Sequence, residues 1–296
     1  MATRRKETYD EIMKQHLSGY KVSALGLHSN GIWKGKEYTH ILPVEYRELN
    51  ILEPYRIEFW KWFEKQKIKL HVYFHHLSSS QAMCFNLFFP FIAENKTYVQ
   101  TLGDVFGLSG TIQDAQFEVV FNALEFTNFD FCITADSKCL FEIKFTEENF
   151  GKESPDESHV SKYNRVYSPQ MAGKFSEEYS SCDAFLRNYQ IMRNAWNLEP
   201  HTVDRLVFLV PKSNTRLEAD LTVLDRCLSK AYRPRISVVF LEEIVQAFEK
   251  TLPQSAARIH EHFRQFRPKY LPALAAEQVP LAVAAHRLEP AVSAPE

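Results

Sequence analysis

One segment constrains the fold more than any other, because apolar and polar side chains alternate through most of Phe126–Glu147. Successive side chains of a strand point to opposite faces of a sheet. The runs 128–134 and 139–145 therefore each predict a strand with one strongly aromatic face. The residues between them, 135–138, are rich in turn formers, so the two runs predict an antiparallel hairpin.

The polar face of this hairpin carries the most informative side chains. If the turn centres on Asp136, Asp130 lies across from Glu142, and Lys144 follows on the same face. Paired carboxylates suit Mg²⁺ or Mn²⁺, which prefer oxygen ligands. A neighbouring lysine can orient a water and stabilise negative charge in a transition state. This combination indicates metal-assisted hydrolysis of a phosphodiester.

Strand and helix patterns alternate on either side of the hairpin, which predicts an α/β fold with a mixed sheet flanked by helices. The expected strands besides the hairpin are 116–121, 206–210 and 236–240. The expected helices are 53–69, 80–89, 181–194, 216–230, 242–250 and 256–267.

The motifs Phe129-Asp130 and Phe141-Glu142-Ile143-Lys144 resemble the signature of the PD-(D/E)XK nuclease superfamily, the restriction-endonuclease-like fold. The resemblance covers residues 70–252, lacks the nominal proline, and looks like a poorly characterised bacterial branch. It implies an αβββαβ core and a Mg²⁺-dependent (endo)deoxyribonuclease. By this resemblance Asp130 and Glu142 are metal ligands, the Ile143 carbonyl is a third, and Lys144 activates water or stabilises charge.

Many members of that superfamily have a further acidic residue before the aspartate strand, which implies Glu125 here as a metal ligand, with Glu118 as the alternative. In many members the early helix carries that acid, but residues 80–89 contain no carboxylate. The number of metal ions is therefore left open. Gln190 resembles the glutamine that several exonuclease-like members place beside the catalytic lysine.

Other readings of the same residues remain. In the simplest interpretation, Glu142 and Lys144 have no catalytic role and form only the solvated face of an amphipathic hairpin. The main alternative function is a catalytically silent nucleic-acid-binding or assembly module of the same fold, and a more distant one is a protein–protein interaction domain. The sequence leaves open DNA against RNA, endonuclease against exonuclease, and whether a homodimer forms.

Three regions are predicted: an N-terminal extension over 1–69 with an amphipathic helix, a nuclease-like domain over 70–270, and a disordered Ala/Pro-rich tail over 271–296. The first 20 residues are polar, and we expect them to be loosely attached. Residues 146–173 show little periodicity and many charges, so we expect a mobile loop.

Composition excludes several classes. The formal net charge of −2 gives no global sign of a nucleic-acid coat protein, although a local basic groove stays compatible with it. Five cysteines without a C-x-x-C pair favour reduced thiols and a cytoplasmic location. No apolar stretch approaches the roughly 20 residues that span a bilayer. Residues 31–36 are too short for a P-loop, and the histidines of 71–76 lack partners for zinc.

Overall fold

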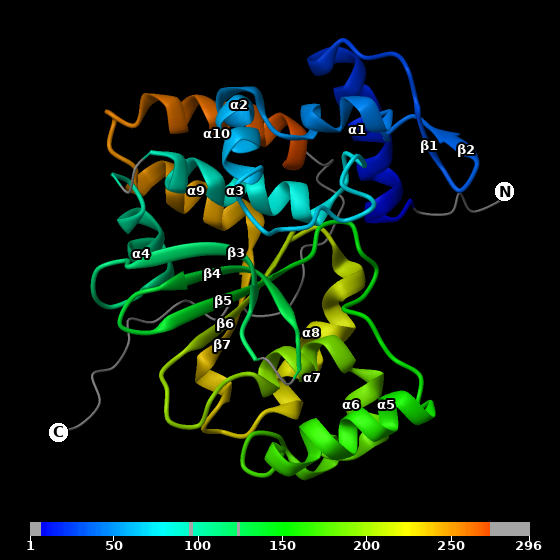
Figure 1. The fold of residues 1–296 in the computed structure, drawn as a ribbon, viewed down its shortest axis with the longest axis vertical. Coiled ribbons are helices and arrows are strands. Elements are labelled where there is room, and N and C mark those ends of the chain that lie inside the picture. The colour runs from blue at the N-terminus through cyan, green and yellow to red at the C-terminus, as the bar shows by residue number, and fades with distance from the viewer. Residues whose placement is uncertain (1–6, 95–96, 123–124, 273–296) are drawn as a thin grey trace, which may run out of the picture.

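A five-stranded mixed sheet forms the centre of the molecule (Figure 1). The computed structural model describes residues 7–94, 97–122 and 125–272. The strands lie in the order β3-β4-β5-β6-β7, with β3, β4 and β5 antiparallel and β5, β6 and β7 parallel. The strands of this sheet are β3 (Asp114–Val120), β4 (Asn128–Thr134), β5 (Lys138–Ile143), β6 (Arg205–Val210) and β7 (Ile236–Phe240). A separate hairpin pairs β1 (Gly31–Trp33) with β2 (Lys36–Tyr38).

Helices cover both faces of the sheet, so the molecule has three layers (Figure 1). One layer holds α1 (Tyr9–Leu25), α2 (Glu53–Phe63), α3 (Ser80–Ala93), α9 (Leu241–Thr251) and α10 (Ala257–Tyr270), with α4 (Gln100–Phe106) beside it. The other layer holds α5 (Glu157–Lys162), α6 (Cys182–Arg187), α7 (Tyr189–Trp196) and α8 (Glu218–Cys227). Each layer has its own apolar core against the sheet. The predicted α/β class, with a mixed sheet flanked by helices and an N-terminal helix, is confirmed.

The hairpin of β4 and β5 forms in the predicted register. Phe131 pairs with Phe141 and Thr134 pairs with Lys138. The aromatic face packs on α3, where the ring of Phe88 stacks on Phe131 with their centroids 4.1 Å apart. Burying such rings contributes about 2 to 3 kcal/mol each, which fixes this face against α3. The opposite face, with Glu142, is thereby turned toward the second helical layer.

Residues 7–20 are not loosely attached, so the expectation for them was wrong, and residues 1–6 lie outside the described residues. Thr8 and Glu11 form a capping box at the start of α1. Tyr9, Met13 and Leu17 then follow at intervals of one helical turn and are buried in the core that contains α3 and α10. This apolar stripe is one residue wide, so the polar composition of the segment conceals it.

The expected loop over residues 146–173 is also wrong in part, because it contains helix. Asp156 caps α5 by accepting from the His159 N–H, and a π-helical turn, Tyr163–Tyr167, follows. Tyr163 and Tyr167 are buried in the core of the second layer. Aromatic burial therefore orders a stretch whose charges conceal its periodicity.

The predicted helix over 181–194 is two helices, α6 and α7, which are separated at Asn188, where φ is −123°. The division into a domain over 70–270 and an extension over 1–69 stays a prediction. Of the predicted tail, residues 273–296 lie outside the described residues. Within the described part of the chain, no helix combines the length and apolarity that crossing a membrane requires. The five cysteines are free thiols.

Candidate active site

Three carboxylates lie side by side across β3, β4 and β5. The residue pairs that flank Glu118 in the β3–β4 register put it across from Asp130. The β4–β5 register, continued by one residue, puts Asp130 across from Glu142. The structure therefore brings together the two carboxylates that the hairpin predicts, and adds Glu118 as a third.

The carboxylate of Asp130 takes over a main-chain hydrogen bond of the sheet. The N–H of Ile143 donates to Asp130 Oδ2 over 2.6 Å. Regular pairing between β4 and β5 ends at Phe131 and Phe141, directly before this contact. A side chain thus occupies the point where the two strands part, and it is held there by a charge-assisted bond.

Glu142 is held by three donors and is almost fully buried, with 3% of its surface exposed. Its Oε1 accepts from Gln190 Nε2 at 2.6 Å and lies 3.0 Å from Lys144 Nζ. Its Oε2 accepts from Asn194 Nδ2 at 2.8 Å. Gln190 and Asn194 lie one turn apart on α7, so a single helix face positions this carboxylate.

The sequence analysis did not identify Asn194 as a site residue. The available signal was its spacing of four residues from Gln190, which puts both side chains on one helix face. Its side chain is completely buried, and its Oδ1 is a buried atom without a hydrogen-bond partner among the described residues. The one hydrogen bond described for the Asn194 side chain is the one that its Nδ2 donates to Glu142. Asn194 therefore belongs to the same cluster.

Lys144 is charged in this environment. Burial alone would lower the pKa of its ammonium, but the negative charges of Glu142, Glu147 and Asp130 outweigh burial and raise the pKa. Its side chain is 12% exposed, so most of it is enclosed by the cluster.

The cluster carries more negative than positive charge. Burial raises the pKa of Asp130 well above its usual value, and the charges of Glu142 and Glu118 raise it further, while Lys144 acts against them. Burial also raises the pKa of Glu118. Two acidic groups with raised pKa values beside one lysine make a site that favours an additional cation.

Glu118 reaches the cluster through an unusual backbone conformation. Its φ is +52°, in the left-handed region that non-glycine residues rarely occupy. Its carboxylate accepts from Gln81 Nε2 on α3 at 2.7 Å and lies 3.9 Å from His71 Nε2. Strained conformations of this kind concentrate at functional sites. The side-chain amide of Gln81 on α3 therefore holds the carboxylate of Glu118.

Glu125 lies in a different cluster. Its side chain is completely buried and pairs with Lys162 Nζ at 3.0 Å. It also accepts from the hydroxyl of Tyr167 at 2.7 Å and from the Thr127 N–H at 2.9 Å. The electrostatic neighbours of Asp130 are Glu142, Lys144 and Glu118, and Glu125 is not among them. The structure therefore places the alternative acid, Glu118, beside the hairpin instead of Glu125.

The donor set for a metal ion is small. Across the described ranges, no group of three or more His, Cys, Asp and Glu side chains is arranged to hold a metal ion. The oxygen donors at hand are the carboxylates of Asp130 and Glu142 and the carbonyl of Ile143. These are hard ligands of the kind that suit Mg²⁺ or Mn²⁺, and their surplus negative charge fits a divalent cation.

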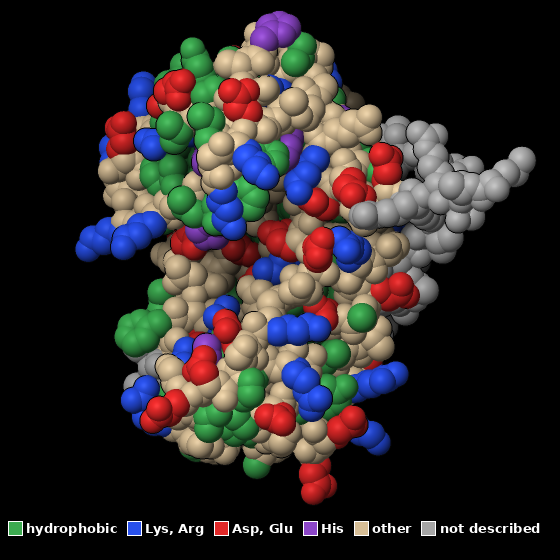
Figure 2. Space-filling view, turned by 90° about the vertical axis from the view of Figure 1, so that its right-hand side faces the viewer, with side chains coloured by type: hydrophobic (Ala, Val, Ile, Leu, Met, Phe, Trp, Pro, Cys, Tyr) green, Lys and Arg blue, Asp and Glu red, His purple; other side chains and the backbone are tan. Residues whose placement is uncertain are grey.

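The surface is hollowed between the two helical layers. Figure 2 shows this hollow across the middle of one face, with acidic and basic side chains gathered in it. A concave site lined by charged groups is accessible to a polar, charged substrate.

The fold and this cluster define an α/β protein of the restriction-endonuclease-like class. The chain belongs to the family described as "Restriction Endonuclease associating with ARP", whose model matches residues 14–271. No curated protein and no solved structure shows a significant match to the chain. Family membership supports a nuclease-like function for the protein as a whole and assigns no role to a single residue.

Proposed function

We propose that this protein is a metal-dependent nuclease of the PD-(D/E)XK type that hydrolyses phosphodiester bonds in DNA. One observation carries the proposal: Asp130, Glu142 and Lys144 meet where β4 and β5 part. Three charged side chains at one point of a sheet cost stability, since like carboxylates repel and buried charges lose hydration. Family membership supports the same reaction class.

In this proposal Asp130, Glu142 and the Ile143 carbonyl hold Mg²⁺ or Mn²⁺. The bound ion would supply charge stabilisation for the attacking water and the phosphoryl group. Lys144, kept charged by its acidic neighbours, would orient the water and stabilise the negative charge that develops on phosphate. Gln190 and Asn194 hold Glu142 and act as positioning residues.

The test is cleavage of supercoiled plasmid and of linear single-stranded and double-stranded DNA, with Mg²⁺, Mn²⁺ or EDTA. We expect metal-dependent cleavage by the wild type, which Lys144→Ala lowers by about 100-fold or more. Lys250→Ala serves as the matched control, because Lys250 is an exposed lysine in the last turn of α9, outside the cluster.

Cleavage by the wild type that EDTA does not remove would contradict the metal requirement. Equal cleavage by wild type and Lys144→Ala would show that the site lies elsewhere or that the activity is a contaminant. DNA binding without any cleavage by the wild type would favour the catalytically silent binding or assembly module. The small donor set is the observation that favours this second candidate.

The partners in this proposal are DNA and a protein of the kind named ARP in the family description. Co-purification of tagged protein with such a partner tests the second of these. A homodimer and a cytoplasmic location stay predictions. The oligomeric state is measured by light scattering.

A further inference from the structure

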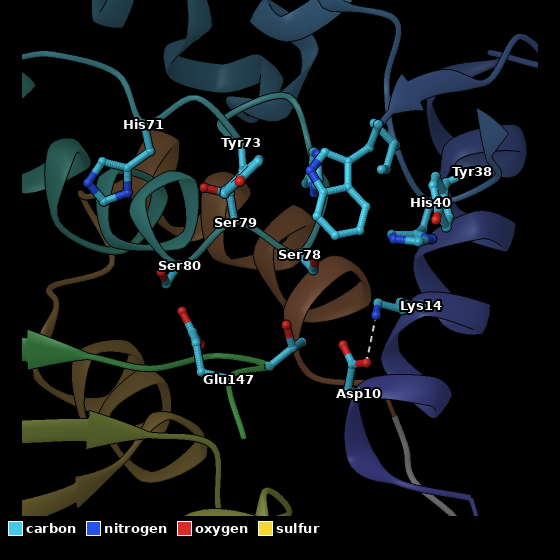
Figure 3. Close-up of a pocket in the computed structure, with 14 residues that line it drawn as sticks. Asp10, Lys14, Tyr38, His40, His71, Tyr73, Ser78, Ser79, Ser80 and Glu147 are labelled. Atoms are coloured by element: carbon cyan, nitrogen blue, oxygen red, sulfur yellow. Dashed lines mark hydrogen bonds and ion pairs between the residues drawn. The ribbon is translucent and has the colours of Figure 1, made fainter. Parts of the chain in front are cut away.

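A pocket of about 310 Å³ opens beside the carboxylate cluster. It lies between α1, the β1–β2 hairpin, residues 71–80 and the segment after β5, where Thr146 and Glu147 form its floor (Figure 3). His71 lines this pocket and also lies 3.9 Å from Glu118 of the cluster. Glu147 acts electrostatically on Lys144. The pocket and the candidate active site therefore adjoin.

The hairpin that forms one wall is firmly attached. Its two turn residues, Lys34 and Gly35, both have positive φ, as a tight two-residue turn requires. The N–H of Gly31 donates to Ile41 O at 2.9 Å. A Cβ at Gly31 would stand 2.3 Å from Leu42 O, so only glycine allows this approach. These contacts fix the β1–β2 hairpin, and with it Trp33, in place.

Aromatic rings dominate the pocket. The centroid of Trp33 lies 5.9 Å from Tyr38 and 6.0 Å from Tyr73, and Tyr73 lies 5.2 Å from His76. Tyr73 has 46% of its surface exposed, which is unusual because a ring of this size is normally buried. The exposed part of Tyr73 is therefore a surface on which a planar ligand can stack.

The polar groups of the pocket favour an uncharged ligand over a phosphate. Lys14 is already paired with Asp10 at 2.7 Å. Burial lowers the pKa values of His40 and His76 to about 4, so neither is charged near neutrality. Glu147 points into the pocket and would repel an anion (Figure 3).

One polar atom of the pocket lacks a partner. His76 Nε2 is buried and has no hydrogen-bond partner within the described ranges. A buried polar atom without a partner destabilises the protein unless a ligand satisfies it. The hairpin of this wall also carries two exposed lysines, Lys36 and Lys34, and the Nζ of Lys34 lies 4.6 Å from the centroid of the Trp33 ring. Exposed lysines commonly contact phosphates.

From this pocket we infer that the protein binds one unstacked nucleobase of its substrate strand against Tyr73, beside Trp33 and Tyr38, next to the bond that is cut. The inference rests on the proposed function for its substrate class. A base supplies the planar surface and the hydrogen-bonding edge that the pocket lacks, and taking it out of the stack brings its own backbone toward the carboxylates. The favoured substrate is then a strand with unpaired nucleotides.

The experiment measures equilibrium binding by fluorescence anisotropy in EDTA, so that cleavage plays no part. The probes are a single-stranded oligodeoxycytidine of about a dozen nucleotides and an abasic strand of equal length, which keeps the phosphates and lacks the bases. By the usual size of base–aromatic stacking, we expect the wild type to bind the first about tenfold more tightly. Tyr73→Ala should remove most of this difference.

Tyr46→Ala is the matched control, since Tyr46 is exposed to 44%, nearly as much as Tyr73, and does not line the pocket. Trp33→Ala should weaken binding as Tyr73→Ala does, and Trp33→Phe, which keeps a ring, should restore most of it. Equal binding of the two probes by the wild type would overturn the inference. So would equal affinities of Tyr73→Ala and Tyr46→Ala.

Free deoxycytidine monophosphate, added as a competitor, distinguishes a pocket that binds a nucleic-acid strand from one that binds a free nucleotide. If it competes as well as the oligonucleotide, the ligand is a free nucleotide and the inference is wrong. Because binding is measured without metal, failure of the nuclease proposal leaves these affinities unchanged, and the two failures can be told apart.

Discussion

Two buried glutamates in this molecule each pair with a lysine at the same distance and differ in what else surrounds them. Glu142 lies 3.0 Å from Lys144, and Glu125 lies 3.0 Å from Lys162. The side chain of Glu142 is 4% exposed and that of Glu125 is 0% exposed. An ion pair alone therefore does not distinguish a reactive site from a structural one.

The surroundings make the distinction. Glu125 has one lysine, a tyrosine hydroxyl and a main-chain N–H, so its charge is balanced and its lone pairs are used. Glu142 shares its lysine with Asp130 and Glu147, and Glu118 acts on Asp130 as well, so negative charge is in excess. A balanced cluster ties α5 to the sheet, whereas an unbalanced one sacrifices stability and can bind a cation.

The largest contrast is expected in activity. Asp130→Asn should lower DNA cleavage by about 100-fold or more, because it removes a charged ligand from the proposed metal site. Glu125→Gln should keep cleavage within about threefold, since its neighbours are structural. Initial rates of plasmid nicking in Mg²⁺ measure both. A loss of cleavage in Glu125→Gln as large as in Asp130→Asn would place Glu125 in the site after all.

The second contrast is in stability. Lys162→Ala leaves Glu125 buried without its cation and should lower the free energy of unfolding by about 2 kcal/mol, less than for a fully buried pair, since Lys162 is 30% exposed. Lys144→Ala should also destabilise the metal-free protein. Urea unfolding with and without Mg²⁺ separates them. Mg²⁺ should stabilise Lys162→Ala by as much as it stabilises the wild type, because the proposed metal site is intact. It should stabilise Lys144→Ala by more, because that variant lacks the cation that offsets the carboxylates. Equal responses to Mg²⁺ would contradict the difference in charge balance.

The smallest effect concerns Asp130 in metal-free protein. Asp130→Asn should raise the free energy of unfolding by about 1 kcal/mol at about pH 8, because it removes one of the repelling charges. The pKa of Asp130 is raised in the folded state, so the wild-type carboxyl becomes protonated as the pH falls through that pKa. The gain should therefore shrink as the pH is lowered.

Asp204→Asn is the control for this measurement. Asp204 also accepts a main-chain N–H of β5, that of Lys138, over 2.8 Å. Its replacement should destabilise the protein, because a charge-assisted bond becomes a neutral one without relief of repulsion. A gain of stability from Asp204→Asn would mean that repulsion is not specific to the cluster.

Local patterns predicted the centre of this fold and the core of the site. Alternation located β4 and β5, and the turn around Asp136 determined which residues face each other. That register was enough to put Asp130 across from Glu142, because a tight hairpin leaves little freedom in pairing. Their roles, and those of Lys144, Ile143 and Gln190, stay predictions.

What was missed depends on long-range packing. The connection from β3 to β4 is not a tight turn, so the sequence does not fix which residue of β3 meets Asp130, and Glu125 was preferred over Glu118. The left-handed φ of Glu118 is likewise set by its contacts with Gln81 and by the sheet. Tertiary burial orders α1 and the region of α5, where the local signals are only a cap and a narrow apolar stripe.

The contact between Ile143 and Asp130 gives the molecule a reporter of its own. The Ile143 amide proton points at a carboxylate, so its chemical shift and its exchange with solvent depend on whether that carboxylate is charged, protonated or bound to an ion. Most amides of a central strand sense only the strand beside them. This one would register occupancy of the site in a nuclear magnetic resonance spectrum before any bond is cut.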